Sequence, residues 1–164
     1  MSTKIDVNPA INVARYFAFR ANFDGEIITP LRMQKLVYYA YVWVLIKKGI
    51  KLFKEKFQAW PNGPVLPSLY QALKIFKNSG IDMNFIDISN EEELDKLKAS
   101  FSKEELEILD KVYEKFIKKS AFELVALTHN ENPWKNARKG LSPTDSSVQE
   151  IQDKDIIETY GTKA

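Results

Sequence analysis

The chain has 164 residues, contains no cysteine, and carries 24 basic against 22 acidic side chains. At this length one domain is the default, and we expect residues 1–164 to form a single compact domain. The lack of cysteine excludes disulfide frameworks, thiolate metal sites and cysteine nucleophiles.

Helical signals dominate the first fifty residues. Asn8-Pro9 and Thr29-Pro30 each combine a capping side chain with a proline, which is typical of a helix start. Apolar residues recur at helical spacing after both sites, and Gly49 stands where a left-handed C-terminal cap ends a helix. We predict a helix after each site and expect the second, over Leu31–Lys48, to be the central and most buried one.

The middle of the chain gives weaker signals. Lys51–Trp60 alternates loosely, which fits a short extended or hairpin segment, and Pro61–Pro64 has the composition of a turn. Helical spacing resumes after Pro67 and predicts a helix that stops near Gly80. The alternation in Ile81–Asp87 predicts a second short strand or an extended linker.

Helices also dominate the remainder. The charged stretch Glu91–Lys98 predicts a helix, and Asp153 or Lys154 to Tyr160 predicts a last short one. Two capping boxes, with a serine three residues before a glutamate, mark further helix starts. They are Ser102 with Glu105, and Ser120 with Glu123. The predicted fold class is therefore mostly α, a helical domain with a short extended or hairpin segment.

The N-terminus and the longest apolar run bear on the location of the protein. The first eight residues are polar and show no signal-peptide pattern. The longest apolar run, Leu36–Ile46, has eleven residues, and a membrane-spanning helix needs about twenty. We expect a cytoplasmic protein that does not use a membrane as a partner.

His129 is the only histidine, so a histidine-based catalytic or metal site would have to be built around it. Ser120, Thr128 and Glu131 are the nearby candidates for such a site. The sequence lacks a second histidine four residues on, and its six glycines never cluster into a phosphate-binding loop. We favour a structural histidine and predict no enzyme, no catalytic residue, no cofactor and no metal.

Charge is distributed unevenly along the chain. Residues 1–80 carry 12 basic and 4 acidic side chains, whereas residues 81–164 carry 12 basic and 18 acidic ones. Five lysines lie close to aromatic residues Phe53, Phe57 and Trp60, and they form our candidate partner surface. These lysines are Lys47, Lys48, Lys51, Lys54 and Lys56. Lysines and rings together fit a single-stranded nucleic acid, and the same charges fit an acidic protein surface.

Three stretches of the chain are similar to motifs of one known family. Ile28–Ala40, followed by Trp43, resembles a helix written ITPLKLQKLLYYA in that family. Phe57–Tyr70 resembles the segment FEAWxxGPVxPxxY, although Gln58 replaces the usual acid. Ser120–Trp134 contains elements similar to SAxEL and LTHxExPW. In order and spacing these motifs resemble the Panacea domain, the SocA-like and GepA-like phage-associated antitoxin family.

The resemblance implies a non-enzymatic antitoxin that neutralises the toxin encoded beside it by direct binding. At least one relative is understood to deliver its toxin to a bacterial protease, so a protease is a further candidate partner. The alternative that we keep open is a nucleic-acid-binding regulator of its own operon. The residues that match the family motifs are expected to be structural or partner-binding. They are Gln34, Lys35, Tyr38, Tyr39, Trp60, Gly63, Pro64, Thr128, His129, Pro133 and Trp134.

Overall fold

The computed structural model describes residue 6 and residues 8–161. These residues form nine α-helices, one 3-10 turn and a two-stranded hairpin, which confirms the predicted mostly α fold. None of the helices in this part of the chain is long and apolar enough to cross a membrane. The elements are α1 (Pro9–Asp24), α2 (Pro30–Lys48), β1 (Gln58–Trp60), β2 (Gly63–Val65), α3 (Pro67–Leu73), η1 (Lys74–Phe76), α4 (Met83–Ile86), α5 (Glu91–Lys98), α6 (Lys103–Phe116), α7 (Ala121–His129), α8 (Asn132–Ala137) and α9 (Asp153–Tyr160).

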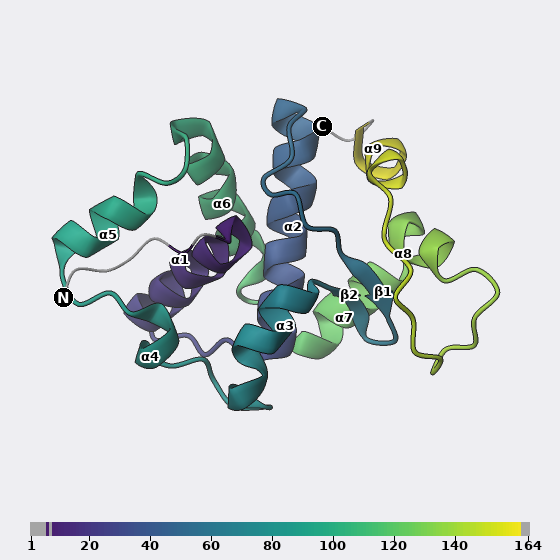
Figure 1. The fold of residues 1–164 in the computed structure, drawn as a ribbon, viewed down its shortest axis with the longest axis horizontal. Coiled ribbons are helices and arrows are strands. Elements are labelled where there is room, and N and C mark those ends of the chain that lie inside the picture. The colour runs from purple at the N-terminus through teal and green to yellow at the C-terminus, as the bar shows by residue number, and fades with distance from the viewer. Residues whose placement is uncertain (1–5, 7, 162–164) are drawn as a thin grey trace.

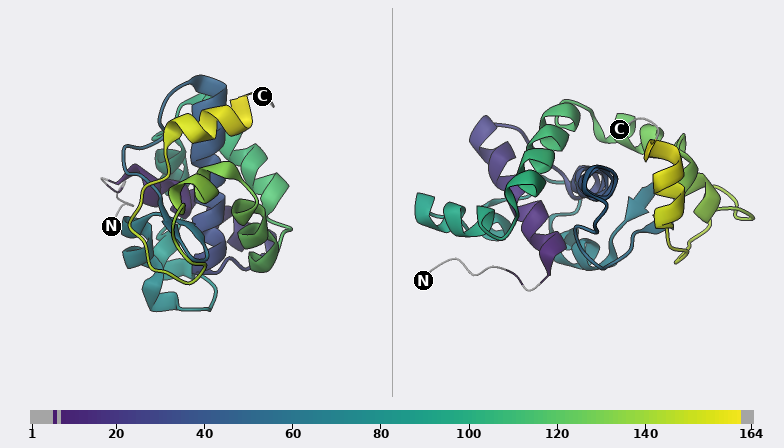
Figure 2. Two further views of the ribbon diagram at one scale, coloured as in Figure 1. Left: turned by 90° about the vertical axis from the view of Figure 1, so that its right-hand side faces the viewer. Right: turned by 90° about the horizontal axis from the view of Figure 1, so that it is seen from above.

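Helix α2 runs through the middle of the molecule, and the other elements surround it (Figure 1, Figure 2). The Thr29 side chain caps its start by accepting a hydrogen bond from the Arg32 amide, and Pro30 occupies the first turn. The helix ends at Gly49, whose φ of +68° is a conformation that glycine adopts without strain. Nearly every residue over positions 33–45 is buried, which confirms the prediction of a central helix.

Aromatic rings fill the core between α2 and its neighbours α1 and α6. Tyr39 of α2 stacks on Phe116 of α6, with 4.5 Å between ring centroids. Phe17 of α1 packs against Tyr113 of α6 at 6.3 Å, and all four side chains are buried. Such pairs add about 0.5–1.5 kcal/mol each beyond the area that they bury. Helices α1, α2 and α6 therefore share one aromatic core, and the hairpin packs against α2 and α7.

The hairpin lies beside α2 and is extended by the C-terminal tail. Strands β1 and β2 are antiparallel, with Trp60 opposite Gly63. Residues 149–151 run along the other edge of β1, where the Ala59 amide donates to the Gln149 carbonyl at 2.9 Å. The tail thus protects an edge that a two-stranded hairpin would leave unpaired.

The local signals in the second half of the chain are largely confirmed. Both serine–glutamate pairs form complete capping boxes, at the starts of α6 and α7. Helix α5 occupies the predicted residues, and α9 begins at Asp153. Hydrogen bonds that close within three residues are the part of a fold that sequence specifies most directly.

Two local predictions are wrong in the middle of the chain. Residues 83–86 form helix α4 and not a strand or linker, because the Asp82 side chain accepts a hydrogen bond from the Asn84 amide and starts a helical turn. The helix after Pro67 ends at Phe76 and not near Gly80, since Lys77 takes a left-handed φ of +52°. In both places a local cap or turn overrides the side-chain pattern.

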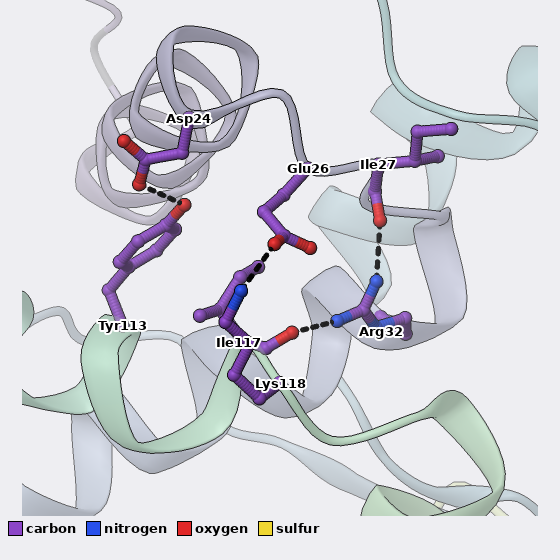
Figure 3. A network of polar contacts seen from close by, with 7 residues as sticks. All are labelled: Asp24, Glu26, Ile27, Arg32, Tyr113, Ile117 and Lys118. Carbon is purple, nitrogen blue, oxygen red and sulfur yellow. Dashed lines mark hydrogen bonds and ion pairs between the residues drawn. The ribbon is translucent and has the colours of Figure 1, made fainter.

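Arg32 joins the loop between α1 and α2 to the end of α6 (Figure 3). Its guanidinium donates hydrogen bonds to the carbonyls of Ile27 and Ile117, which lie far apart in sequence. In the same network Tyr113 donates to Asp24 at 2.9 Å. The start of α2 is therefore fixed from two sides.

Candidate functional site

The family-motif residues of α2 hold the hairpin through buried hydrogen bonds. The Gln34 side chain accepts from the Leu66 amide at 2.8 Å and donates to the Leu66 carbonyl at 3.2 Å. From the next residue, the Lys35 ammonium donates to the Pro64 carbonyl at 2.9 Å. Amide and ammonium side chains thus replace the strand partner that β2 lacks on this side. We call Gln34, Lys35, Gly63, Pro64 and Thr128 the hairpin cluster.

Lys35 is wholly buried within this cluster. Burial disfavours its charged form and lowers the pKa of Lys35 to about 7. A Cβ placed on Gly63 would lie 2.7 Å from both Lys35 Cε and Thr128 Oγ1, and Gly63 has a φ of +104°. Glycine is therefore required at position 63 for two reasons, the backbone conformation and the close approach of two side chains.

The two motif tryptophans are tied to the hairpin turn. Trp134 of α8 donates its indole N–H to the Trp60 carbonyl at 2.9 Å. The Trp60 indole N–H donates to Gln58 Oε1 at 2.9 Å. Gln58, which replaces the acid usual in the family, keeps an acceptor oxygen at this position. The turn between β1 and β2 is thus fixed to α8 through its backbone and to β1 through a side chain.

His129 lies flat against Trp134 at the end of α7. The two ring centroids are 4.0 Å apart and the planes meet at 18°. Burial lowers the pKa of His129, a hydrogen bond to the Pro61 backbone opposes this, and the positive charges of Lys35 and Arg138 lower it further. Its Nε2 is buried without a hydrogen-bond partner in the described part of the chain. His129 therefore connects the Trp134 segment to the hairpin turn as a neutral ring.

The two motif tyrosines of α2 are buried on the side that faces α7 and α9. Tyr39 donates its hydroxyl to Glu131 at 2.8 Å, and its pKa is raised by burial and by that carboxylate. Tyr38 packs edge-on against Phe57 at 5.1 Å, and burial raises its pKa as well. Pro133, at the start of α8, is also buried. These residues make contacts within the chain, and their side chains are not exposed to solvent.

Arg138 belongs to the same assembly, although sequence reasoning did not single it out. It is buried, and its guanidinium donates to the Ala59 carbonyl at 2.8 Å and to the carbonyls of Ser142 and Asp145 at 2.8 and 2.9 Å. The guanidinium also lies 5.4 Å from the centre of the Trp134 ring. One feature of the sequence could have drawn attention to this residue, because Arg138 is the only arginine after Arg32.

The basic stretch that we predicted as a partner surface is divided in the structure. Lys47 and Lys48 line a groove between α2 and α6. Lys51 pairs with Asp153 at 3.4 Å and, together with Lys54, lines a separate hollow beside the start of α1. Lys56 is half-buried. The five lysines therefore do not form one continuous strip.

Two of the three rings in this stretch are inaccessible. Phe53 and Phe57 are 4% and 3% exposed and belong to the core, while Trp60 is half-buried. A stacking platform for nucleic-acid bases needs ring faces open to solvent. Phe53 and Phe57 therefore cannot stack on nucleic-acid bases, and only the lysines still favour a nucleic-acid interface at this stretch.

The exposed edge of the motif region forms a further hollow, which we call the Trp60 cleft. It has a volume of about 430 Å³ and is lined by Trp60, Pro61 and Tyr70, with Lys74 and Lys77 at its border. The rings of Trp60 and Tyr70 are 5.1 Å apart. Here motif side chains reach the surface, whereas the hairpin cluster beneath them is buried.

Among the described residues, no group of three or more histidine, cysteine, aspartate or glutamate side chains is placed to hold a metal ion. The model of one protein family, described as the SocA-like antitoxin with a Panacea domain, matches residues 33–135. The chain belongs to the Panacea domain family. No curated protein and no solved structure matches the chain.

The Panacea match begins in α2 and ends in α8, so it covers the hairpin and every motif residue named above. Arg138 lies just outside it, as do α1 and α9. Within the Panacea region, the side chains of the hairpin cluster form contacts inside the chain. Several motif positions reach the surface: those of the Trp60 cleft, the half-buried Trp43, His129 and Trp134, and the exposed Ser120 and Glu123.

Proposed function

We propose that this protein is an antitoxin that neutralises a cognate protein toxin by binding it directly, without catalysis. The observation that carries the proposal is the Panacea domain over residues 33–135, whose family is described as SocA-like antitoxins. The toxin-binding surface includes the basic stretch around Lys47 and Lys48 and the exposed part of the Trp60 turn.

The contacts of the motif residues support a binding role over an enzymatic one. Lys35, the side chain with the strongest candidate nucleophile chemistry, is wholly buried and hydrogen-bonded to the Pro64 carbonyl. His129 stacks on Trp134 and its Nε2 is buried, so this nitrogen is not presented to a substrate. General acid–base catalysis requires a side chain within hydrogen-bond reach of the substrate.

Co-expression with the open reading frame next to its own gene tests this function. We expect that product to stop growth when expressed alone and growth to return when this protein is present. The two proteins should also purify as a complex. A neighbour that is harmless alone, or that remains lethal beside this protein, contradicts the proposal.

The same cells test whether the protein also acts as a protease adaptor. Delivery to a protease shortens the half-life of the toxin when this protein is present, whereas simple occlusion leaves the half-life unchanged or longer. Repeating the measurement in strains that lack individual proteases identifies the enzyme. An unchanged half-life together with full protection assigns neutralisation to binding alone.

A further inference from the structure

A groove lies between α2 and α6, on a part of the surface that the hairpin does not occupy. Its volume is about 750 Å³. The two helices run in opposite directions along it, since Lys48 pairs with Glu104 near one end while Tyr39 stacks on Phe116 near the other. We call this hollow the Trp43 groove.

The interior of the Trp43 groove is apolar. Trp43 from α2 and Ile108, Val112 and Phe116 from α6 line it. Trp43 is half-buried, and its ring packs edge-on against Tyr160 of α9 at 5.4 Å. Half-buried tryptophan in a groove of this kind is a frequent anchor point in protein interfaces.

Lysines surround this apolar interior. The Lys47 and Lys115 ammonium groups lie 5.8 and 5.9 Å from the centre of the Trp43 ring. Lys111 lines the same groove, one helical turn before Lys115. In the part of the chain that the structure describes, none of these three lysines forms an ion pair with a carboxylate. Their charges are therefore available to a partner.

The Trp43 groove has fewer acidic side chains than lysines, and the acidic charges are partly neutralised. Glu104 pairs with Lys48 at 3.7 Å, and Glu107 lies four residues before Lys111 on the same helix. The groove consequently keeps a net positive charge around an apolar interior. The Trp43 ring is half-buried and packs edge-on against Tyr160, whereas a nucleic-acid base needs an open ring face on which to stack. The apolar interior and this ring therefore favour a protein ligand over a nucleic acid.

We propose that the Trp43 groove binds an acidic segment of the cognate toxin, with an apolar side chain of that segment against Trp43 and carboxylates beside Lys47, Lys111 and Lys115. The proposal rests on the antitoxin function stated above and deepens it by naming the surface and the chemistry of the bound segment. A groove between two antiparallel helices suits an amphipathic segment whose apolar face enters and whose charged flanks remain at the rim.

Charge reversal on α6 tests the proposal. The double variant Lys111→Glu, Lys115→Glu changes two exposed side chains of the groove, and Lys135→Glu, Lys139→Glu is a matched control. The control changes two exposed lysines with the same four-residue spacing outside the groove. Both variants should melt close to the wild type, because exposed substitutions usually change stability by less than about 0.5 kcal/mol.

The measurement is calorimetric titration of each purified variant with the product of the neighbouring open reading frame. We expect the groove variant to bind at least about tenfold more weakly than the wild type and the control to bind within about threefold. The affinity of the wild type should also fall more steeply with salt than that of the groove variant. Equal affinity of the groove variant and the wild type would overturn the groove assignment and leave the antitoxin function standing.

Hydrogen exchange on the wild-type complex gives a readout without substitution. Bound toxin should slow exchange in residues 43–48 and 104–116. Protection confined to the Trp60 cleft would place the interface there and overturn the groove assignment. If the wild type does not bind the product at all, the antitoxin proposal itself fails, which is a separate outcome.

Discussion

Lys35 places an ammonium group inside the protein with one hydrogen bond, to the Pro64 carbonyl. A buried charge with so little compensation lowers stability, and the pKa of Lys35 at about 7 expresses that penalty. What the side chain provides is a fixed position for β2 against α2. Lys35 therefore lowers the free energy of unfolding, but it fixes the position of the hairpin.

The lowered pKa of Lys35 predicts a pH dependence of stability. Between the folded pKa of about 7 and the unfolded value of 10.5, the unfolded chain retains a proton that the folded protein has released. Stability due to this group therefore rises with pH in that window, by about 2–3 kcal/mol from pH 7 to pH 9. Denaturant unfolding of the wild type and of Lys35→Met from pH 6 to pH 9 measures the difference.

The free energy of unfolding of the wild type should increase relative to that of Lys35→Met across this range. The subtraction removes the titration of groups that both proteins share. A difference that stays constant with pH would mean that the Lys35 ammonium is not desolvated.

Gly63 supplies a second prediction at the scale of one residue. Gly63→Ala adds a Cβ 2.7 Å from Lys35 Cε and Thr128 Oγ1 at a φ of +104°. We expect a loss of about 3 kcal/mol or more, which lowers the melting temperature by roughly 6–12 °C for a chain of this size. Gly25→Ala is the matched control, because Gly25 also has a positive φ but has nothing within 4 Å of the added Cβ. It should lose only about 1–2 kcal/mol, and equal losses would show that the contacts at Gly63 do not matter.

At the scale of elements, Arg138, at the end of α8, connects β1 to the irregular loop that follows α8. It bonds β1 through Ala59 and the loop after α8 through Ser142 and Asp145. The tail that follows this loop pairs with β1. One buried guanidinium therefore holds the loop that brings the tail to the hairpin.

Substitution of Arg138 should release this loop before it unfolds the core. We expect Arg138→Ala to lose about 2–4 kcal/mol, because three carbonyls lose a charged donor. Limited proteolysis should cut residues 139–148 faster, and the Ala59 amide, which donates to Gln149, should exchange faster. Lys139→Ala, at an exposed neighbour, should behave as the wild type. Unchanged cleavage of Arg138→Ala contradicts the role assigned to the guanidinium.

The elements that could be predicted from the sequence are those with local causes. Capping boxes, proline starts and Gly49 act within one or two turns, and the helices that they mark are present. Helix α4 was predicted incorrectly, because Asp82 starts a turn inside an alternating pattern. The short helix α8 was not predicted either, since only six residues are helical there.

The candidate site depends on contacts that no local pattern contains. The resemblance supplied most of its residues, but not the contacts that they make some thirty residues later, where Lys35 bonds the backbone of β2 at Pro64 and Gln34 bonds that of Leu66, just after β2. Arg138 was missed for the same reason. The five lysines were grouped by sequence proximity. After the end of α2 the chain separates Lys47 and Lys48, which line one hollow, from Lys51 and Lys54, which line another.

At the scale of the whole molecule, the uneven charge of the sequence is partly neutralised by folding. Three ion pairs each join a basic residue of the first half to an acidic residue of the second half. They are Arg20 with Asp110 at 2.8 Å, Lys48 with Glu104 at 3.7 Å and Lys51 with Asp153 at 3.4 Å. Lys47, Lys111 and Lys115 of the Trp43 groove form no such pair among the described residues. The molecule as a whole is thus a helical scaffold with a localised basic surface.

In the proposed function, this scaffold neutralises its toxin by occupying it and not by chemical turnover. Titration of a fixed amount of purified toxin with purified protein distinguishes the two. Toxin activity should fall in proportion to the added protein and reach zero at a fixed molar ratio. Inactivation of many toxin molecules by one molecule of this protein, or no inactivation at any ratio, would contradict it.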